Sequence, residues 1–238
     1  MKNVILKVHF FYGNFEEGER IELTGEEAKH ARVLRLRPGE QVGILDGMGR
    51  IRIGETILAE PQKTVLNITG SQVFPRENPQ IHLSVSLIKD RDRMEWLIEK
   101  MTELGVAEFT PLICNHTERT SFNRDRWEKI ITASFKQCGR PWRPVLNDIT
   151  SFDRFVQAGF EGWSIIGLQS GRPFSGMPKS GQARSIRIII GPEGDFSENE
   201  IQLAKQYGFE AISFGNARYR TETAGLVATI SMSLFDPQ

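Results

Sequence analysis

The sequence predicts a two-part protein in which a small β-rich domain, residues 1–74, precedes an α/β domain, residues 80–238. Up to Val73 the chain reads as short strands joined by turns, whereas later apolar strand patterns alternate with helical ones. Strands separated by helices need crossover connections, so the second domain should hold a mostly parallel sheet covered on both faces. The polar stretch 75–79, with a proline at each end, is the expected linker.

Composition narrows the class of protein. Among 238 residues, lysine plus arginine equals aspartate plus glutamate at 30 each, so any affinity for nucleic acid must come from a local patch. Cys114 and Cys138 lack metal-ligand spacing, and the histidines form no cluster, so no metal site is expected. Two thiols, no bilayer-length apolar run and no signal peptide predict a soluble cytoplasmic protein.

One segment of the amino-terminal part carries a row of cations. Only residues 25–34 hint at a helix there. Apolar Val33, Leu34 and Leu36 are interleaved with basic residues, namely Lys29, His30, Arg32, Arg35 and Arg37. This alternation predicts apolar side chains packed on the domain and a cationic row suited to a phosphate backbone. The alternative is a solvated face balanced by nearby glutamates.

In the carboxyl-terminal part, apolar patterns and glycine stops delimit the elements. Strands are expected at 81–87, 106–113, 163–168, 186–190 and 211–214. Helices are expected around the apolar positions of 94–104, 127–138, 152–156 and 226–234, and after Ser197. Asp125 with Glu128 should begin the second helix, and Ser151 the third. Residues 169–181 read as a loop rich in glycine and proline.

The turn Gly191-Pro192-Glu193-Gly194 after the strand 186–190 is the most informative stretch. Its glycines can adopt backbone angles closed to other residues and leave N–H groups uncovered for a ligand. Ser197 and Glu200 form a capping box, so a helix follows almost at once. Open α/β sheets bind ligands in such loops at the carboxyl ends of strands, although a tight connection without a ligand is the alternative.

A second informative loop, 215–225, precedes the last helix. Thr221 is a fair N-cap for that helix, and Glu222 suits its positive end. Arg218 and Arg220 can hold an anionic group or stabilise developing negative charge; the alternative is a surface arginine paired with Glu222. Three loops should converge on one pocket at the strand ends, those after Leu168, Ile190 and Phe214.

These motifs resemble, in order along the chain, those of the ribosomal RNA small-subunit methyltransferase E family, a family of knotted SPOUT methyltransferases. The matching segments are His30 with 33–35, Lys100-x-x-Glu103-Leu-Gly-Val, 111–112 with 118–119, 137–144, 191–194 and 220–224. The resemblance implies a PUA-like β-barrel that binds RNA, followed by an α/β domain with a trefoil knot. It also implies a homodimer that methylates N3 of one uridine in small-subunit (16S) ribosomal RNA.

The resemblance implies S-adenosylmethionine as methyl donor and assigns residues to it: Leu168, Ile190, Gly191, Pro192, Glu193, Gly194, Phe214, Gly215, Asn216, Tyr219 and Thr221. The expected RNA contacts are Lys29, His30, Arg32, Arg35, Lys89, Arg119 and Arg140. Arg220 is expected to stabilise the charge on the uridine. Glu103 is expected either to position groups at a subunit interface or to form an ion pair with Lys100.

This chain departs from the family pattern at a few positions. Asp195 stands where many relatives carry glycine, Tyr219 replaces a common leucine, and Ala217 occupies a position that is often arginine. Which arginine meets the substrate therefore stays open, and no residue stands out as a general base. The rival functions are methylation of another RNA position by a related enzyme and RNA binding without catalysis. A nicotinamide dehydrogenase is disfavoured because no Gly-x-Gly-x-x-Gly follows a predicted strand.

Overall fold

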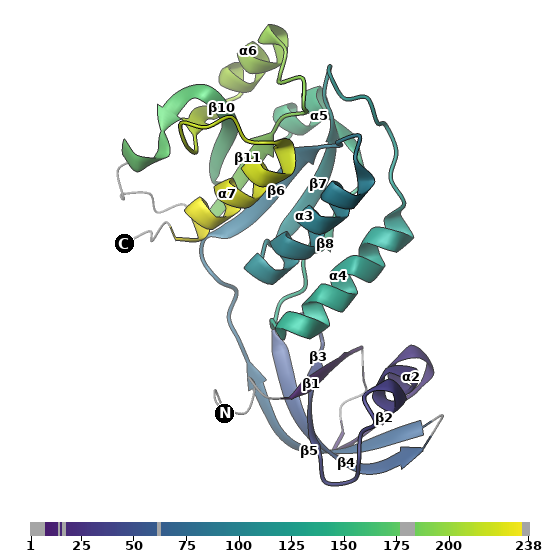
Figure 1. Cartoon of the computed structure of the whole chain (residues 1–238). Coiled ribbons are helices and arrows are strands. Elements are labelled where there is room, and N and C mark those ends of the chain that lie inside the picture. Colours follow the sequence, from purple (N-terminus) through teal and green to yellow (C-terminus); the bar gives the residue numbers. More distant parts are fainter. Residues whose placement is uncertain (1–7, 14, 16–17, 61–62, 177–183, 235–238) are drawn as a thin grey trace. The chain divides into compact units, whose positions relative to one another are not determined.

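The structure is a computed structural model that describes residues 8–13, 15, 18–60, 63–176 and 184–234. The chain divides into two compact units. The first comprises residues 1–76 together with 132–143, and the second comprises 77–131 together with 144–238. The two units are drawn in Figure 1.

The first unit is built on a five-stranded sheet in the order β1-β3-β4-β5-β2. Its strands are β1 (His9–Tyr12), β2 (Arg20–Leu23), β3 (Gln41–Leu45), β4 (Arg50–Glu60) and β5 (Lys63–Val73). The pairing of β1 with β3 is parallel, and the other pairings are antiparallel. Helix α2 (Gly25–Val33) buries Ala28 and Ala31. The predicted β-rich unit with one helix near 25–34 is confirmed.

One packing expectation for the basic row was wrong. Val33 is 75% exposed, although Leu34 is half-buried and Leu36 is buried. The reason is that α2 ends at Val33 and the backbone turns at Arg35, whose φ is 55°. The expected packing of the apolar residues of this segment therefore fails at Val33.

Residues 132–143 belong to the first unit through both apolar and polar contacts. Phe135 packs with Phe10, Leu45 and Ile51 in a small core. Close by, the Nζ of Lys136 lies 2.7 Å from Oε1 of Glu27. The first unit is therefore formed by chain segments that are far apart in sequence.

The second unit contains a parallel sheet in the order β12-β10-β11-β6-β7-β8, with β9 paired to β7. All the pairings are parallel. The strands are β6 (Gln80–Ser86), β7 (Glu108–Ile113), β8 (Val145–Leu146), β9 (Thr150–Ser151), β10 (Trp163–Pro173), β11 (Ser185–Ile190) and β12 (Glu210–Ser213). The two short strands β8 and β9 were not predicted.

Helices cover both faces of this sheet, as predicted (Figure 1). They are α3 (Arg91–Leu104), α4 (Arg124–Cys138), α5 (Phe152–Gln157), α6 (Glu198–Gln206) and α7 (Thr221–Ser233), with a 3-10 turn at Phe174–Gly176. One face packs on α3, the first half of α4 and α7, and the other packs on α5 and α6. In β11, Ile188 faces the first layer and Ile189 the second, which explains its almost continuous apolar sequence.

Local signals placed most helix ends correctly. The capping box of Ser197 and Glu200 is present at the start of α6. Gly105 ends α3 with a left-handed φ of 78°. The start of α4 was predicted wrongly: Asn123, not Asp125, accepts the hydrogen bond from Arg126 N, at 3.0 Å. A residue two positions earlier satisfies the free N–H groups of that helix.

Strand β10 is longer than predicted. After an irregularity between Gly167 and Arg172 it pairs again with β12, Arg172 opposite Ile212. The predicted loop 169–181 is therefore wrong up to Pro173, because a neighbouring strand supplies hydrogen bonds that polar and glycine residues alone do not suggest. The part of that loop at 177–183 lies outside the described residues. Across the described chain, no helix combines the length and apolarity needed to cross a membrane.

Candidate functional site

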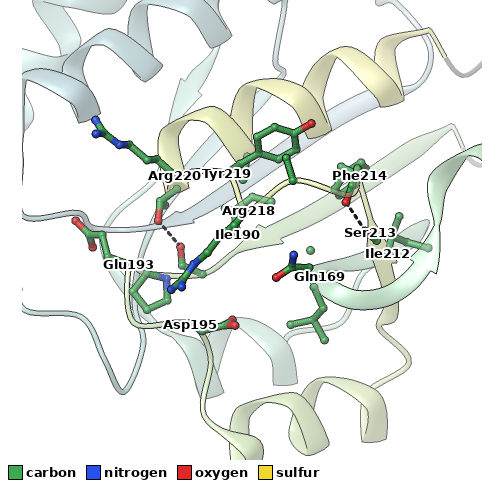
Figure 2. Close-up of a pocket in the computed structure, with 18 residues that line it drawn as sticks. Gln169, Ile190, Glu193, Asp195, Ile212, Ser213, Phe214, Arg218, Tyr219 and Arg220 are labelled. Atoms are coloured by element: carbon green, nitrogen blue, oxygen red, sulfur yellow. Dashed lines mark hydrogen bonds between the residues drawn. The ribbon is translucent and has the colours of Figure 1, made fainter.

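A pocket of about 320 Å³ lies beside the irregularity within β10 and at the carboxyl ends of β11 and β12. This volume is at the lower end of the range for small-molecule sites, roughly 300 to 1,000 Å³. The loops after β11 and β12 line it, as the sequence predicted, and the third wall is residues 167–169 within β10, where a loop was expected. Figure 2 shows residues of these three segments around the pocket. The predicted donor and catalytic residues that line it are Leu168, Ile190, Gly191, Pro192, Glu193, Phe214, Gly215, Tyr219, Arg220 and Thr221.

Two of the predicted donor residues and one catalytic candidate do not line this pocket. Gly194 lies against another segment, since a Cβ built on it would fall 3.0 Å from Cβ of His116. Asn216 is exposed in the loop before α7. Glu103 lies in the last turn of α3, where its Oε1 is 2.9 Å from Nζ of Lys100. The ion pair weighed as an alternative for Glu103 is therefore present.

The turn after β11 brings bare main chain to the pocket. A Cβ at Gly191 would fall 2.9 Å from the ring of Phe196, so this position has no room for a side chain. Asp195 N donates to the carbonyl of Pro192 at 3.0 Å, which closes the turn. Asp195 itself has a φ of 65°, a left-handed conformation in which glycine would be unstrained. Asp195 nevertheless lines the pocket.

The loop before α7 is tied to that turn by one buried hydroxyl. Thr221 Oγ1 donates to the carbonyl of Gly191 at 3.0 Å, and Thr221 is 5% exposed. Thr221 is the first residue of the helix, and Arg220 occupies the N-cap position without a side-chain bond. The predicted capping role of Thr221 was therefore wrong. Its hydroxyl bonds across the pocket wall because the two loops lie side by side.

The acidic residue in the first turn of α7 pairs with another helix, and the two arginines before α7 are exposed. Glu222 is buried, and its Oε1 lies 3.6 Å from Nη1 of Arg93, so the alternative pairing with an arginine of the loop is wrong. Within the described residues, neither Arg218 nor Arg220 has a hydrogen bond or ion pair through its side chain. In Figure 2, Arg218 extends across the pocket toward Asp195, and Arg220 points outward on the side of Glu193.

The expected RNA contacts lie in both units. In the first unit Lys29 pairs with Glu26 at 2.6 Å, as the solvated-face alternative predicts, whereas Arg32 and Arg35 are exposed and make no ion pair within the described residues. His30 is half-buried, and burial, followed by the charge of Lys136, lowers its pKa. Arg140 also lies in the first unit. Lys89 and Arg119 lie in the second.

Sequence reasoning missed some groups at the pocket. Gln169 lines it directly after Leu168, and its place at the end of a predicted strand was the available signal. The pairing of Arg93 with Glu222 had no local signal, because the two residues lie on different helices. Among the described residues, no group of three or more histidine, cysteine, aspartate or glutamate side chains could hold a metal ion.

Family models match most of the chain. The model of the RNA methyltransferase domain matches residues 76–233, and the model of the RNA methyltransferase PUA domain matches 23–63. The predicted α/β methyltransferase part and the PUA-like character of the amino-terminal part are thereby confirmed. The domain bounds 1–74 and 80–238 and the trefoil knot stay predictions.

Similar proteins are found in several bacteria. The chain is 34% identical over 209 residues to the ribosomal RNA small subunit methyltransferase E of Synechocystis, covering 83% of this chain and 67% of that protein. The Aquifex aeolicus protein of the same name is 25% identical over 231 residues, covering 94% and 98%. The crystal structure of the Neisseria gonorrhoeae enzyme of that name, bound to S-adenosyl methionine, has a TM-score of 0.82 and 28% identity, covering 94% and 96%.

Proposed function

We propose that this chain, which belongs to the ribosomal RNA small-subunit methyltransferase E family, transfers the methyl group of S-adenosylmethionine to N3 of one uridine in small-subunit ribosomal RNA. The observation that carries the proposal is the pocket lined by residues 167–169 of β10 and by the loops after β11 and β12. A relative with the same fold over 94% of this chain was crystallised with that donor. An enzyme of this kind acts where ribosomes assemble, which supports the cytoplasm as its location.

The residues of the pocket fit the proposed donor. Apolar walls formed by Leu168, Ile190 and Phe214 suit a flat base, and the carboxylates of Glu193 and Asp195 suit hydroxyl or ammonium groups. Main chain is exposed where side chains are excluded, since a Cβ at Gly191 or at Gly215 would collide with an aromatic ring. When bound, the donor supplies a methyl group activated by a positive sulfonium.

The chain must then orient a uridine and favour its deprotonated form. N3 of uridine carries a proton and is a weak nucleophile until that proton leaves, so a cation near the ring lowers the barrier. We assign this role to Arg220, which lines the pocket and whose neighbour Glu222 is engaged by Arg93. Alignment by the pocket walls adds up to roughly 7 to 11 kcal/mol in well-oriented cases.

We further infer that the enzyme is a homodimer. On the layer formed by α3 and α7, Trp96 is 42% exposed and Ile230 is 39% exposed. Leu234, directly after α7, is 78% exposed. Such apolar side chains on neighbouring helices support a second copy as their cover. Any part of Glu103 in catalysis would then depend on that second copy, because it does not line the pocket of its own chain.

The Arg220→Ala variant tests the catalytic assignment. We expect donor affinity, measured by calorimetry, to stay within about threefold, while single-turnover methylation falls by roughly a hundredfold or more, in line with the removal of one charge-stabilising group. Arg218→Ala is the matched comparison, since it removes the same charge from the same loop. Unchanged turnover in Arg220→Ala with donor still bound would remove Arg220 from the mechanism, and a reduction confined to Arg218→Ala would transfer the role to that residue.

The identity of the target nucleotide needs a separate measurement. N3-methyluridine in ribosomal RNA should be present in cells that contain this protein and absent from cells that lack it. A missing modification at another RNA position would favour a related methyltransferase with a different target. Binding of RNA without any binding of donor would favour a non-catalytic assembly factor.

A further inference from the structure

Arg119 carries a buried donor group without a partner. It lies in the segment between β7 and α4, and its side chain is partly buried. Its Nη1 has no hydrogen-bond partner in the described part of the chain. Leaving a buried donor unpaired costs about 1 to 3 kcal/mol, and more when the group is charged. Since folded proteins pair nearly all such groups, this N–H group favours a ligand that supplies an acceptor.

The charges around Arg119 favour an anion. Burial, followed by the neighbouring charge of Arg91, lowers the pKa of Arg119, and Glu95 acts in the opposite direction. However, Glu95 is held by Arg126, whose Nη2 lies 2.6 Å from Oε2 and whose Nε donates to the other carboxylate oxygen. The hydrogen bond to Glu95 raises the pKa of Arg126, and the charge of Asp92 also raises it. The carboxylate that acts on Arg119 is therefore already engaged by another arginine, and the charge of Arg91 adds to that of Arg119.

The position of Arg119 relates it to the pocket. His116 contacts the carbonyl of the pocket residue Asp195 through Nδ1, at 2.9 Å. The three steps along the chain from His116 to Arg119 span at most about 11 Å. Lys89 also joins the two regions: its Nζ lies 3.0 Å from Oε2 of Glu118, and its backbone N donates to Oε1 of Glu193 at 3.2 Å. Arg220 points outward on this Glu193 side of the pocket (Figure 2).

We propose that Arg119 binds a backbone phosphate of the RNA strand whose uridine enters the donor pocket. The inference rests on the proposed function, because the bound phosphate belongs to the RNA strand that is the substrate of that reaction. The planar guanidinium matches phosphate oxygens, and a phosphate would complete the bonding of Nη1. The carboxylate of the donor offers similar chemistry. The test separates these two sources.

The test uses the full chain with Arg119→Gln, Arg119→Lys and the control Arg154→Gln, which removes an exposed arginine on α5. Binding of a single-stranded oligouridine is followed by fluorescence anisotropy between about 50 and 200 mM salt. We expect Arg119→Gln to weaken binding several-fold and to reduce the slope of log K against log salt by about 0.7, the value for one phosphate on a single strand. Arg119→Lys should keep the slope while binding more weakly, because lysine keeps the charge without the planar fork.

Two further readouts separate a ligand-binding role from a structural one. The melting temperature of Arg119→Gln should not fall, since the variant removes a partly buried charge whose Nη1 has no hydrogen-bond partner among the described residues. Donor affinity by calorimetry should stay within about twofold of that of the unmodified chain.

The proposal is overturned if Arg119→Gln keeps the slope of the control variant, whatever its melting temperature. It is also overturned if the variant binds the donor more weakly but RNA as tightly as before, which would assign Arg119 to the donor's carboxylate. Failure of the unmodified chain to methylate RNA, with the slope still reduced in Arg119→Gln, would refute the proposed function and leave the phosphate site standing.

Discussion

The bond between Thr221 and Gly191 should control how well the pocket is ordered. Thr221 Oγ1 donates to the carbonyl of Gly191 across 30 residues of chain, and it joins the first turn of α7 to the turn after β11. Thr221→Val keeps the shape of the side chain and replaces the hydroxyl with a methyl group. The carbonyl of Gly191 then has no hydrogen-bond donor from the buried side chain at position 221. We therefore expect both turns to loosen together.

The size of the effect follows from that single bond. A carbonyl left without its partner costs about 1 to 3 kcal/mol. If S-adenosylmethionine must restore the ordered turn when it binds, a cost of about 1.4 kcal/mol weakens its affinity about tenfold. Thr221→Ser is the matched control because it retains the hydroxyl and removes only a methyl group. It should bind the donor within about threefold of the unmodified chain, although reduced methyl burial lowers its stability by about 1 kcal/mol.

Calorimetry with S-adenosylmethionine and urea unfolding measure the two quantities separately. The reasoning is refuted if Thr221→Val binds the donor as tightly as Thr221→Ser. A variant that is less stable but binds normally would show that the bond supports the fold without positioning the pocket.

Two further predictions concern buried and exposed arginines. Arg187 in β11 is 6% exposed, its Nε donates to Ser164 Oγ at 2.7 Å, and its guanidinium lies 4.4 Å from the ring centre of Phe209. Arg187→Met should lower the free energy of unfolding, measured in urea, by about 2 to 4 kcal/mol, because it removes these hydrogen bonds and the packing on the aromatic rings. Equal stability of the two proteins would mean that removing a buried charge cancels this loss. Replacing Arg32 and Arg35 by glutamine should reduce the slope of log K for RNA against log salt by about 0.7 to 0.9 for each phosphate that is no longer neutralised, and an unchanged slope would place the RNA-binding surface elsewhere.

Short-range signals in the sequence were reliable where neighbouring residues decide the structure. The capping box at Ser197 and the left-handed glycine Gly105 set helix ends through bonds within one turn, and both are present. The position of the pocket also followed from order alone, since the carboxyl ends of parallel strands meet at one edge of a sheet. The PUA-like amino-terminal part, in contrast, was recognised through resemblance rather than through periodicity.

Tertiary structure decided the features that depend on residues far apart in the chain. The continuation of β10 to Pro173 requires β12 as its partner, and no pattern within residues 169–173 contains that partner. The same holds for Thr221, which the sequence suggested as a cap and which instead bonds to Gly191. Amino-acid order thus determined the elements and the edge at which the site lies. Which side chains are engaged and which stay available to a ligand was decided by packing, because hydrogen bonds and charges act between neighbours in space.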